Sequence, residues 1–188
     1  MPRRCDVDWR LQHVLAAQDF IVSRDQALQA GLTADALRHR LRTTQWQGLL
    51  PGVYLCHPGE PARRQRLIAA LLYCGSDAAI DGADACRYYG IRSVATDDVL
   101  VHVAVPPSSN VRSCHWIVVR RTAAFDVIRT QMVRYVDPAT AVIAAARRMS
   151  SARNVLAAVS EATQRRIATV KLRPSSGYLK CVCGSGCL

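Results

Sequence analysis

Near the N-terminus, signals for helix starts, helix ends and a turn follow one another within a few residues. Their order constrains the fold more than any other feature of the sequence. Ser23 is a favourable N-cap for a short helix over 24–30, which Gly31 ends. Thr33 is a second N-cap, for a helix over 34–42. Two short helices joined by a tight turn that contains glycine are typical of a helix-turn-helix.

A β-hairpin is expected directly after these helices. Trp46-Gln47-Gly48-Leu49 and Val53-Tyr54-Leu55-Cys56 are two short segments, and Leu50-Pro51-Gly52 lies between them. A Pro-Gly pair suits the centre of a type II turn, because proline fixes the first φ and glycine accepts the positive second φ. The two segments therefore predict two short antiparallel strands.

The residues before the helix pair complete a small domain. Residues 6–18 carry apolar side chains at helical spacing, and residues 20–22 form a short apolar connection. Three helices followed by a hairpin predict a winged helix in residues 1–57.

A second region follows the linker His-Pro-Gly-Glu-Pro at 57–61. The fold class is therefore α+β, with an N-terminal winged helix-turn-helix followed by a small mixed α/β domain in residues 60–170. Strand 115–121 is expected to run antiparallel to strand 99–105. The expected helices and other strands are helices 62–74, 83–89, 138–149 and 151–167, and strands 78–81 and 131–135.

The C-terminal residues 175–188 are rich in glycine, serine and cysteine and have no periodicity, so we expect them to be disordered. Cys181, Cys183 and Cys187 lack the C-x-x-C pair and the fourth ligand that a zinc site needs. We therefore expect no metal site and no cofactor. The cysteines inside apolar segments are expected to be small buried hydrophobic residues: Cys56, Cys74, Cys86 and Cys114.

The charge balance favours a polyanionic partner. The 188 residues include 25 Lys and Arg against 14 Asp and Glu, which gives a net charge of +11 and a pI near 9.8. Nearly all the basic residues are arginine, which makes bidentate contacts with phosphate and guanine. Double-stranded DNA is thus the expected partner, although a GC-rich genome also raises arginine content whatever the function. No apolar run approaches the length of a membrane span, and no hydrophobic segment follows the N-terminal arginines, so we expect a cytoplasmic protein without a membrane partner.

The helix over 34–42 is the principal candidate for DNA contact. Leu37 and Leu41 are four residues apart and face the core, while basic side chains occupy much of the remaining circumference. An ordinary solvated cationic helix face is the alternative interpretation. The candidate DNA-binding residues are Thr33, Arg38, His39, Arg40, Arg42, Gln45 and Gln47, with Pro51 and Gly52 at the turn of the wing.

Residues 20–56 resemble the N-terminal winged-helix domain of AbiEi-family antitoxins of type IV toxin–antitoxin systems. A looser likeness continues through 63–91, the strand pair and 137–148, so that it covers most of residues 6–170. The pieces that carry the resemblance are Ser23-Arg24-Asp25-Gln26-Ala27, Gly31-Leu32, the arginine-rich helix, Trp46 and Leu50-Pro51-Gly52-Val53-Tyr54.

The resemblance implies a DNA-binding transcriptional autorepressor rather than an enzyme. Such antitoxins bind their own promoter through the winged helix, here with the reading helix at 34–42 and the wing at 47–53. Their C-terminal part is needed to neutralise a nucleotidyltransferase-like toxin, without a stable complex. We expect this chain to be a monomer or a weak dimer.

Two other function classes remain open. A remnant nuclease or nucleotidyltransferase is suggested by the basic second region and by Gly75-Ser76 with Asp77, Asp81 and Asp84, although a turn and a helix cap explain these residues more simply. The acid-x-Lys motif of metal-dependent nucleases is absent, because Thr169 and Tyr178 stand two residues before the only lysines. The third possibility is a basic protein-interaction module.

Overall fold

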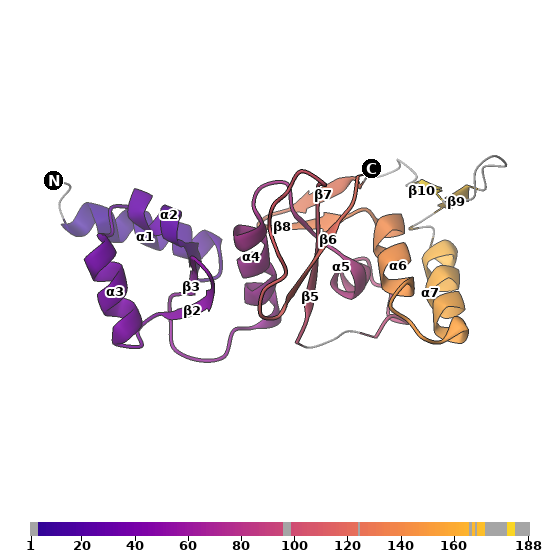
Figure 1. Cartoon of the computed structure of the whole chain (residues 1–188), viewed down its shortest axis with the longest axis horizontal. Coiled ribbons are helices and arrows are strands. Elements are labelled where there is room, and N and C mark those ends of the chain that lie inside the picture. Colours follow the sequence, from indigo (N-terminus) through magenta and orange to yellow (C-terminus); the bar gives the residue numbers. More distant parts are fainter. Residues whose placement is uncertain are drawn as a thin grey trace. The chain divides into compact units, whose positions relative to one another are not determined.

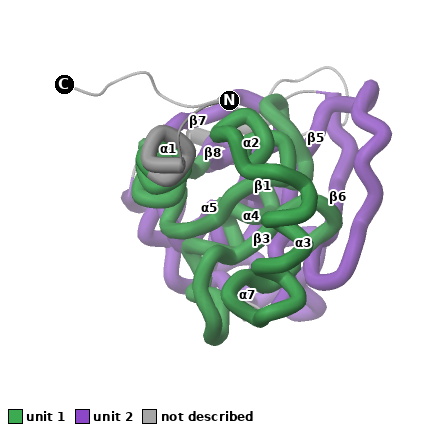
Figure 2. The backbone as a smooth tube through the Cα atoms, turned by 90° about the vertical axis from the view of Figure 1, so that its left-hand side faces the viewer, with its two compact units in different colours: residues 1–77, 131–133 green, residues 78–130, 134–188 purple. Residues whose placement is uncertain are grey.

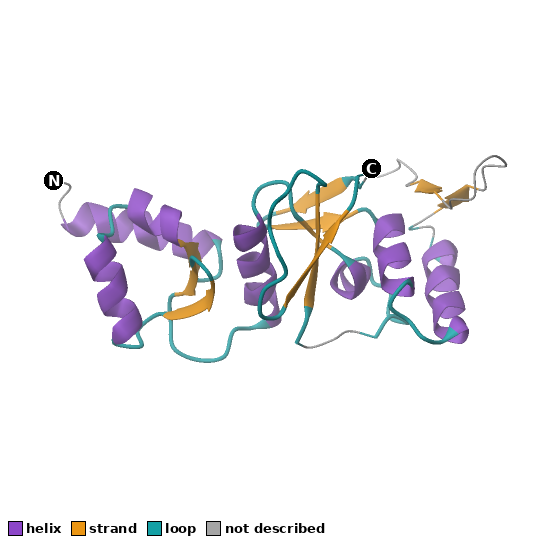
Figure 3. Cartoon of the chain, in the orientation of Figure 1, coloured by secondary structure: helices purple, strands orange, loops and turns teal. Residues whose placement is uncertain are grey.

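The computed structural model describes residues 4–95, 99–123, 125–165, 167, 169–171 and 180–182. Over this part the chain forms seven helices and ten strands, so it is a mixed α and β protein (Figures 1 and 3). It divides into two compact units, residues 1–77 with 131–133 and residues 78–130 with 134–188 (Figure 2). No helix in the described ranges is long and apolar enough to cross a membrane.

The first unit combines four helices with a three-stranded antiparallel sheet of order β1-β3-β2. Its core is a cluster that includes Leu11, Leu37 and Trp46. The elements in chain order are α1 (Arg4–Ala17), β1 (Ile21–Ser23), α2 (Arg24–Gln29), α3 (Ala34–Arg42), β2 (Gln47–Leu50), β3 (Val53–Leu55) and α4 (Arg63–Cys74).

The starts of α2 and α3 follow from local capping. Ser23 and Gln26 form a reciprocal capping box, in which the Gln26 amide donates to Ser23 Oγ at 3.2 Å and the Ser23 amide donates to Gln26 Oε1 at 3.0 Å. The predicted helices over 24–30 and 34–42 are thereby confirmed within a residue or two.

Residues 20–22 are not the plain connection that the sequence predicted. Ile21–Ser23 form β1, which pairs with β3 in the register Ile21↔Leu55 and Ser23↔Val53. Three residues are too few to show strand alternation, so the pairing partner decides their conformation.

Helix α4 lies in the first unit, whereas the predicted first domain ended at residue 57. The Gln65 side chain donates to the backbone carbonyl of Asp19 at 2.9 Å, and Arg64 Nε lies 2.5 Å from Asp19 Oδ2. These bonds tie α4 to the end of α1. Its apolar face is buried as predicted, at Leu67, Ala70 and Leu71.

The second unit is built on a five-stranded sheet of order β6-β5-β4-β8-β7. From this sheet α5, α6 and α7 follow one another in successive layers (Figure 1), α5 packing on β5, α6 on α5 and α7 on α6. Its elements are β4 (Ala79–Ile80), α5 (Gly82–Tyr88), β5 (Val101–Val105), β6 (Ile117–Arg121), β7 (Val127–Thr130), β8 (Val133–Val136), α6 (Pro138–Ala146), α7 (Ala152–Gln164), β9 (Thr169–Lys171) and β10 (Lys180–Val182).

The predicted antiparallel pairing of 115–121 with 99–105 is wrong. Strands β5 and β6 are parallel, in the register Val101↔Ile117 and Val105↔Arg121. The connection of 106–116 is long enough, at about 3.3 Å per residue, to return along a five-residue strand. The chain therefore starts β6 at the same end as β5.

The predicted disordered tail contains one described segment. Lys180–Val182 form β10, which pairs antiparallel with β9, so the expectation of disorder does not hold for these three residues. A glycine- and serine-rich sequence gives no local signal for so short a strand. Residues 175–179 and 183–188 lie outside the described residues.

The four cysteines predicted to be small hydrophobic residues are free thiols. Cys74 and Cys86 are buried as expected, and Cys56 and Cys114 are half-buried. Burial raises the pKa of Cys56 and of Cys86 to about 12. At Cys56 the positive charge of Arg40 acts in the other direction and lowers the pKa by a smaller amount. Both thiols are therefore protonated at neutral pH.

Candidate nucleic-acid interface

The start of α3 is fixed by a single side chain. Thr33 Oγ1 accepts a hydrogen bond from the Ala36 amide at 3.1 Å and so satisfies one of the free donors of the first turn. Before it, Gly31 has a φ of +98°, a conformation that glycine adopts readily and that allows the chain to turn sharply after α2. Together they set the angle at which α3 leaves α2.

The inner side of α3 is anchored in the core of the first unit. The side chain of Leu37 is only 1% exposed, and Leu41 packs against the same cluster. Residues four apart share a helix face, so these leucines fix the rotation of α3 about its axis. The face opposite them is therefore presented to solvent.

Three of the predicted contact residues, Arg38, His39 and Arg42, lie exposed on this helix. Arg38 forms an ion pair with Asp35, and both side chains remain more than 70% exposed. Arg42 Nη2 lies 3.5 Å from His39 Nδ1. Exposed ion pairs of this kind contribute at most about 1 kcal/mol, so a phosphate can replace Asp35 as the partner of Arg38 at little cost.

Arg40 lies differently from its neighbours. It is half-buried, and its guanidinium carbon sits 5.1 Å from the centroid of the Trp46 ring, a cation–π contact. The Trp46 amide also donates to the Arg40 carbonyl at 3.1 Å. Arg40 therefore holds the chain after α3 against the helix.

The two glutamines predicted to contact DNA also differ, because one is exposed and the other is hydrogen-bonded within the unit. Gln45 is exposed next to α3. Gln47 instead donates its side-chain amide to the carbonyl of His57 at 3.1 Å and to that of Gly59 at 2.5 Å. Gln47 thus fixes the linker that follows β3 and is engaged within the unit.

The turn at Pro51 and Gly52 has the predicted form. Gly52 has a φ of +73°, as the third residue of a type II turn requires, and Pro51 is exposed beside it. The carbonyl of Gly52 accepts a hydrogen bond from the Arg24 amide at 2.8 Å, which holds the turn against the start of α2.

This bond reveals a basic residue that the sequence interpretation missed. Arg24 is the first residue of α2, its side chain is exposed, and its backbone is bonded to the hairpin turn. The sequence does show that Arg24 is the first residue of a helix, because Ser23 is a good N-cap. It does not show that Ser23 pairs with Val53, which is what brings Arg24 next to the hairpin turn. Arg24 belongs with Arg38, His39, Arg42 and Gln45 as a candidate contact.

The aspartates that suggested an enzyme are not arranged as metal ligands. Asp81 is fully buried, its Oδ2 lies 2.7 Å from Arg120 Nε, and its Oδ1 accepts from the Gly82 amide at 2.8 Å. Asp77 is exposed. Over the described residues, no group of three His, Cys, Asp or Glu side chains is placed to hold a metal ion. The carboxylate of Asp81 serves as a helix cap and as the partner of the half-buried Arg120.

Comparison with known proteins gives little similarity. No protein-family model matches the chain, and no curated protein matches it. The crystal structure of the Rv2827c protein from Mycobacterium tuberculosis is similar to part of the chain, with 18% sequence identity and a TM-score of 0.39. The similarity covers 63% of this chain and 45% of that protein, so the chain spans less than half of its length.

Proposed function

We propose that the chain is a DNA-binding transcriptional repressor of the antitoxin type, with a winged helix-turn-helix in its first unit. The observation that carries the proposal is the exposed face of α3, where Arg38, His39 and Arg42 project from a helix that Leu37 anchors in the core. A recognition helix requires both properties, since its inner side must be fixed while donors on its outer side reach base edges and phosphates.

The arrangement around α3 supports the same proposal. A helix, a short strand, two helices and a two-stranded hairpin follow one another in the order expected of a winged helix, and β1 lies at the edge of the sheet, which supports the proposal. The net charge of +11 favours a polyanion. The antitoxin part of the proposal rests on the resemblance of residues 20–56 and their continuation to AbiEi-family antitoxins.

The DNA-binding part is tested with substitutions on the outer face of α3. We expect Arg38→Ala with Arg42→Ala to lower affinity for the upstream DNA by at least about tenfold, since a good bidentate contact contributes about 1–3 kcal/mol. The matched control is Arg153→Ala together with Arg147→Ala, which removes the same charge from exposed residues of the second unit. Equal affinity of the two double variants contradicts the assignment of α3.

The antitoxin part needs a separate experiment. If a nucleotidyltransferase-like toxin is encoded beside this chain, co-expression is expected to restore the growth of cells that the toxin arrests, without co-purification of the two proteins. Failure to restore growth, with the chain present at normal levels, contradicts the antitoxin role and leaves the DNA-binding role to be decided by the α3 variants.

A further inference from the structure

A groove with a volume of about 330 Å³ runs between α1 and α2 of the first unit. None of the candidate contacts described above lines it. The residues that do are Trp9, Arg10, His13 and Val14 of α1, Gln26 and Gln29 of α2, and Ala30, the C-cap of α2. The groove is therefore formed by two helices of one unit, and the second of them leads into the turn before α3.

The rim of this groove is accessible from outside. Trp9 is 66% exposed, and Arg10, His13 and Gln29 are exposed as well. Trp9 and His13 lie one helical turn apart, with their ring centroids separated by 6.1 Å. Leu11 is only 3% exposed and anchors α1 in the core, which fixes the rotation of the helix and keeps the rim on its outer side.

The polar groups on the rim are hydrogen-bond donors. The guanidinium of Arg10, the indole N–H of Trp9, the amide of Gln29 and a ring N–H of His13 all donate. No Asp or Glu is among the described residues that line the groove. A partner rich in acceptors and negative charge fits such a surface, and the phosphate oxygens of a nucleic-acid backbone have both properties.

The groove lies close to the start of α3. Gln29 is four residues before Thr33, the N-cap of α3, so the chain between them spans at most about 14 Å. In helix-turn-helix complexes the first residues of the recognition helix reach the base edges, while the helix before it crosses the DNA backbone. A duplex that meets the start of α3 therefore passes within reach of the groove.

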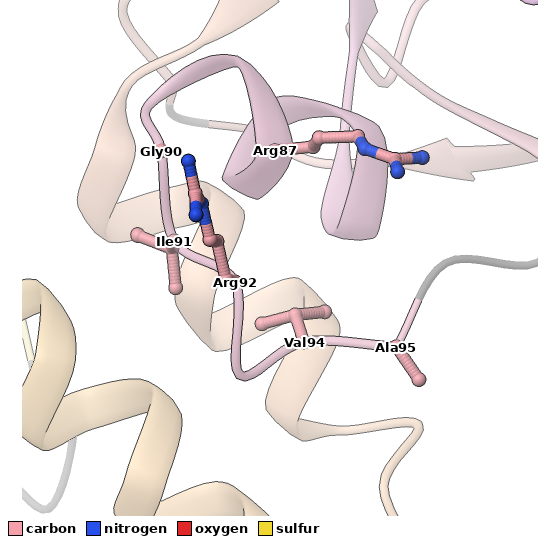
Figure 4. Close-up of a pocket in the computed structure, with 6 residues that line it drawn as sticks. All are labelled: Arg87, Gly90, Ile91, Arg92, Val94 and Ala95. Atoms are coloured by element: carbon pink, nitrogen blue, oxygen red, sulfur yellow. The ribbon is translucent and has the colours of Figure 1, made fainter.

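The cavity that follows α5 in the second unit is larger, at about 590 Å³, but its side chains do not form a comparable surface. Figure 4 shows that the side chains of Arg87 and Arg92 point in different directions. Ile91 and Val94 also line this cavity and are only 1% and 6% exposed. The groove of the first unit thus offers a partner more accessible side-chain surface.

We propose that the groove between α1 and α2 binds the phosphate backbone of the DNA, with Arg10 as the phosphate contact and with Trp9 and Gln29 beside it. This inference rests on the proposed DNA-binding function. A second copy of the chain is a poorer occupant, because a two-fold contact through this groove brings the Arg10 side chains of both copies to one interface, where like charges repel.

The salt dependence of DNA binding tests the phosphate contact. The full chain and its Arg10→Gln variant are titrated with the upstream duplex and with a scrambled duplex at several salt concentrations. Arg10→Gln is expected to weaken binding of both duplexes by the same factor, about three- to tenfold, and to lower the salt slope by about one. Arg153→Gln removes the same charge from an exposed position of α7 and should change binding by less than about twofold. Equal effects of the two variants overturn the proposal.

Trp9 provides a second readout, located at the groove itself. The chain has three tryptophans, of which Trp46 is 5% exposed and Trp116 is half-buried. Saturating upstream duplex is expected to change the tryptophan emission of the parent chain, and Trp9→Phe should remove most of that change. An emission change of the same size in Trp9→Phe overturns the proposal.

The outcomes separate this inference from the DNA-binding proposal. Absence of binding to either duplex by the parent chain overturns both. Weaker binding by the α3 double variant, together with equal effects of Arg10→Gln and Arg153→Gln, overturns only the assignment of the groove. Sedimentation of the parent chain and of Trp9→Ala tests the other occupant, since a dimer that Trp9→Ala abolishes assigns the groove to a second copy and overturns the proposal. Thermal unfolding of each variant within a few degrees of the parent chain ensures that a loss of binding reflects the missing side chain, because Trp9 and Arg10 are exposed.

Discussion

The guanidinium carbon of Arg40, on α3, lies 5.1 Å from the centroid of the ring of Trp46, the residue just before β2. Trp46 is 5% exposed and belongs to the core cluster of the first unit. This contact divides the arginines of α3 into two groups. Arg38 and Arg42 are presented to solvent, whereas Arg40 contributes to the stability of the unit.

Substitution of Arg40 should therefore mainly lower stability, whereas substitution of Arg42 should mainly weaken DNA binding. Arg40→Ala is expected to lower the free energy of unfolding by about 1 kcal/mol, through loss of the cation–π contact and of packing on Trp46. Arg42→Ala should change it by less than about 0.5 kcal/mol but should weaken DNA binding more. Urea unfolding and DNA titration of both variants check this division, and greater destabilisation by Arg42→Ala contradicts it.

Removal of the α3 cap should affect both stability and DNA affinity. Thr33→Ala leaves the Ala36 amide without its side-chain acceptor and is expected to cost about 1 kcal/mol of stability. Because the first turn of α3 then frays, affinity for the upstream DNA should fall severalfold. Thr33→Ser is the matched control, since serine caps equally well. Equal loss in both variants would mean that the cap does not matter for either property.

Local signals in the sequence were sufficient for most helices. Ser23 and Thr33 gave the starts of α2 and α3, and Asp137 followed by Pro138 gave the start of α6, where Asp137 Oδ1 accepts from the Thr140 amide at 3.0 Å. Capping depends on residues three positions apart, so it can be predicted from the sequence. The type II turn at Pro51 and Gly52 was predictable as well, because it depends on two adjacent residues.

Pairing over longer distances was not predictable. The strand at Ile21–Ser23 exists because it pairs with Val53–Leu55, and the parallel direction of β6 depends on the path of the whole connection before it. Within the candidate interface, the exposed positions of Arg38 and Arg42 followed from helical periodicity. The inward roles of Arg40 and Gln47 depend on Trp46, His57 and Gly59, which the helix pattern does not reveal.

The buried carboxylate in the second unit should be essential for stability. Asp81 is 0% exposed and is paired with Arg120, whose Nη2 is buried without a hydrogen-bond partner in the described part of the chain. Asp81→Ala leaves a partly buried arginine uncompensated and removes the cap of α5, so we expect a loss of about 3–5 kcal/mol. Asp77→Ala, at an exposed position, should change stability by less than about 0.5 kcal/mol. Chemical denaturation of both variants decides the matter, and a mild effect of Asp81→Ala contradicts a structural role.

The raised thiol pKa values predict a stability that falls in alkaline solution. Between pH 9 and 12, Cys56 and Cys86 keep their protons in the folded chain but lose them in the unfolded chain, whose thiols have the ordinary pKa of 9.0. The folded state then binds more protons, so the free energy of unfolding decreases as pH rises, by up to about 1.4 kcal/mol per pH unit for each thiol. Urea unfolding at several pH values above 9 measures this slope. The variant with Cys56→Ala and Cys86→Ala should show a shallower slope, and an unchanged slope contradicts the prediction.

The most direct test of DNA recognition is fluorescence-anisotropy titration of the purified chain with its own upstream DNA and with a scrambled duplex, across a salt series. Specific recognition by α3 predicts a preference of about 10³-fold or more for the upstream DNA, together with a steep fall in affinity as salt increases. Equal, salt-sensitive binding to both duplexes would contradict the proposal, because it would mean that the net charge of +11 provides only non-specific attraction to phosphate.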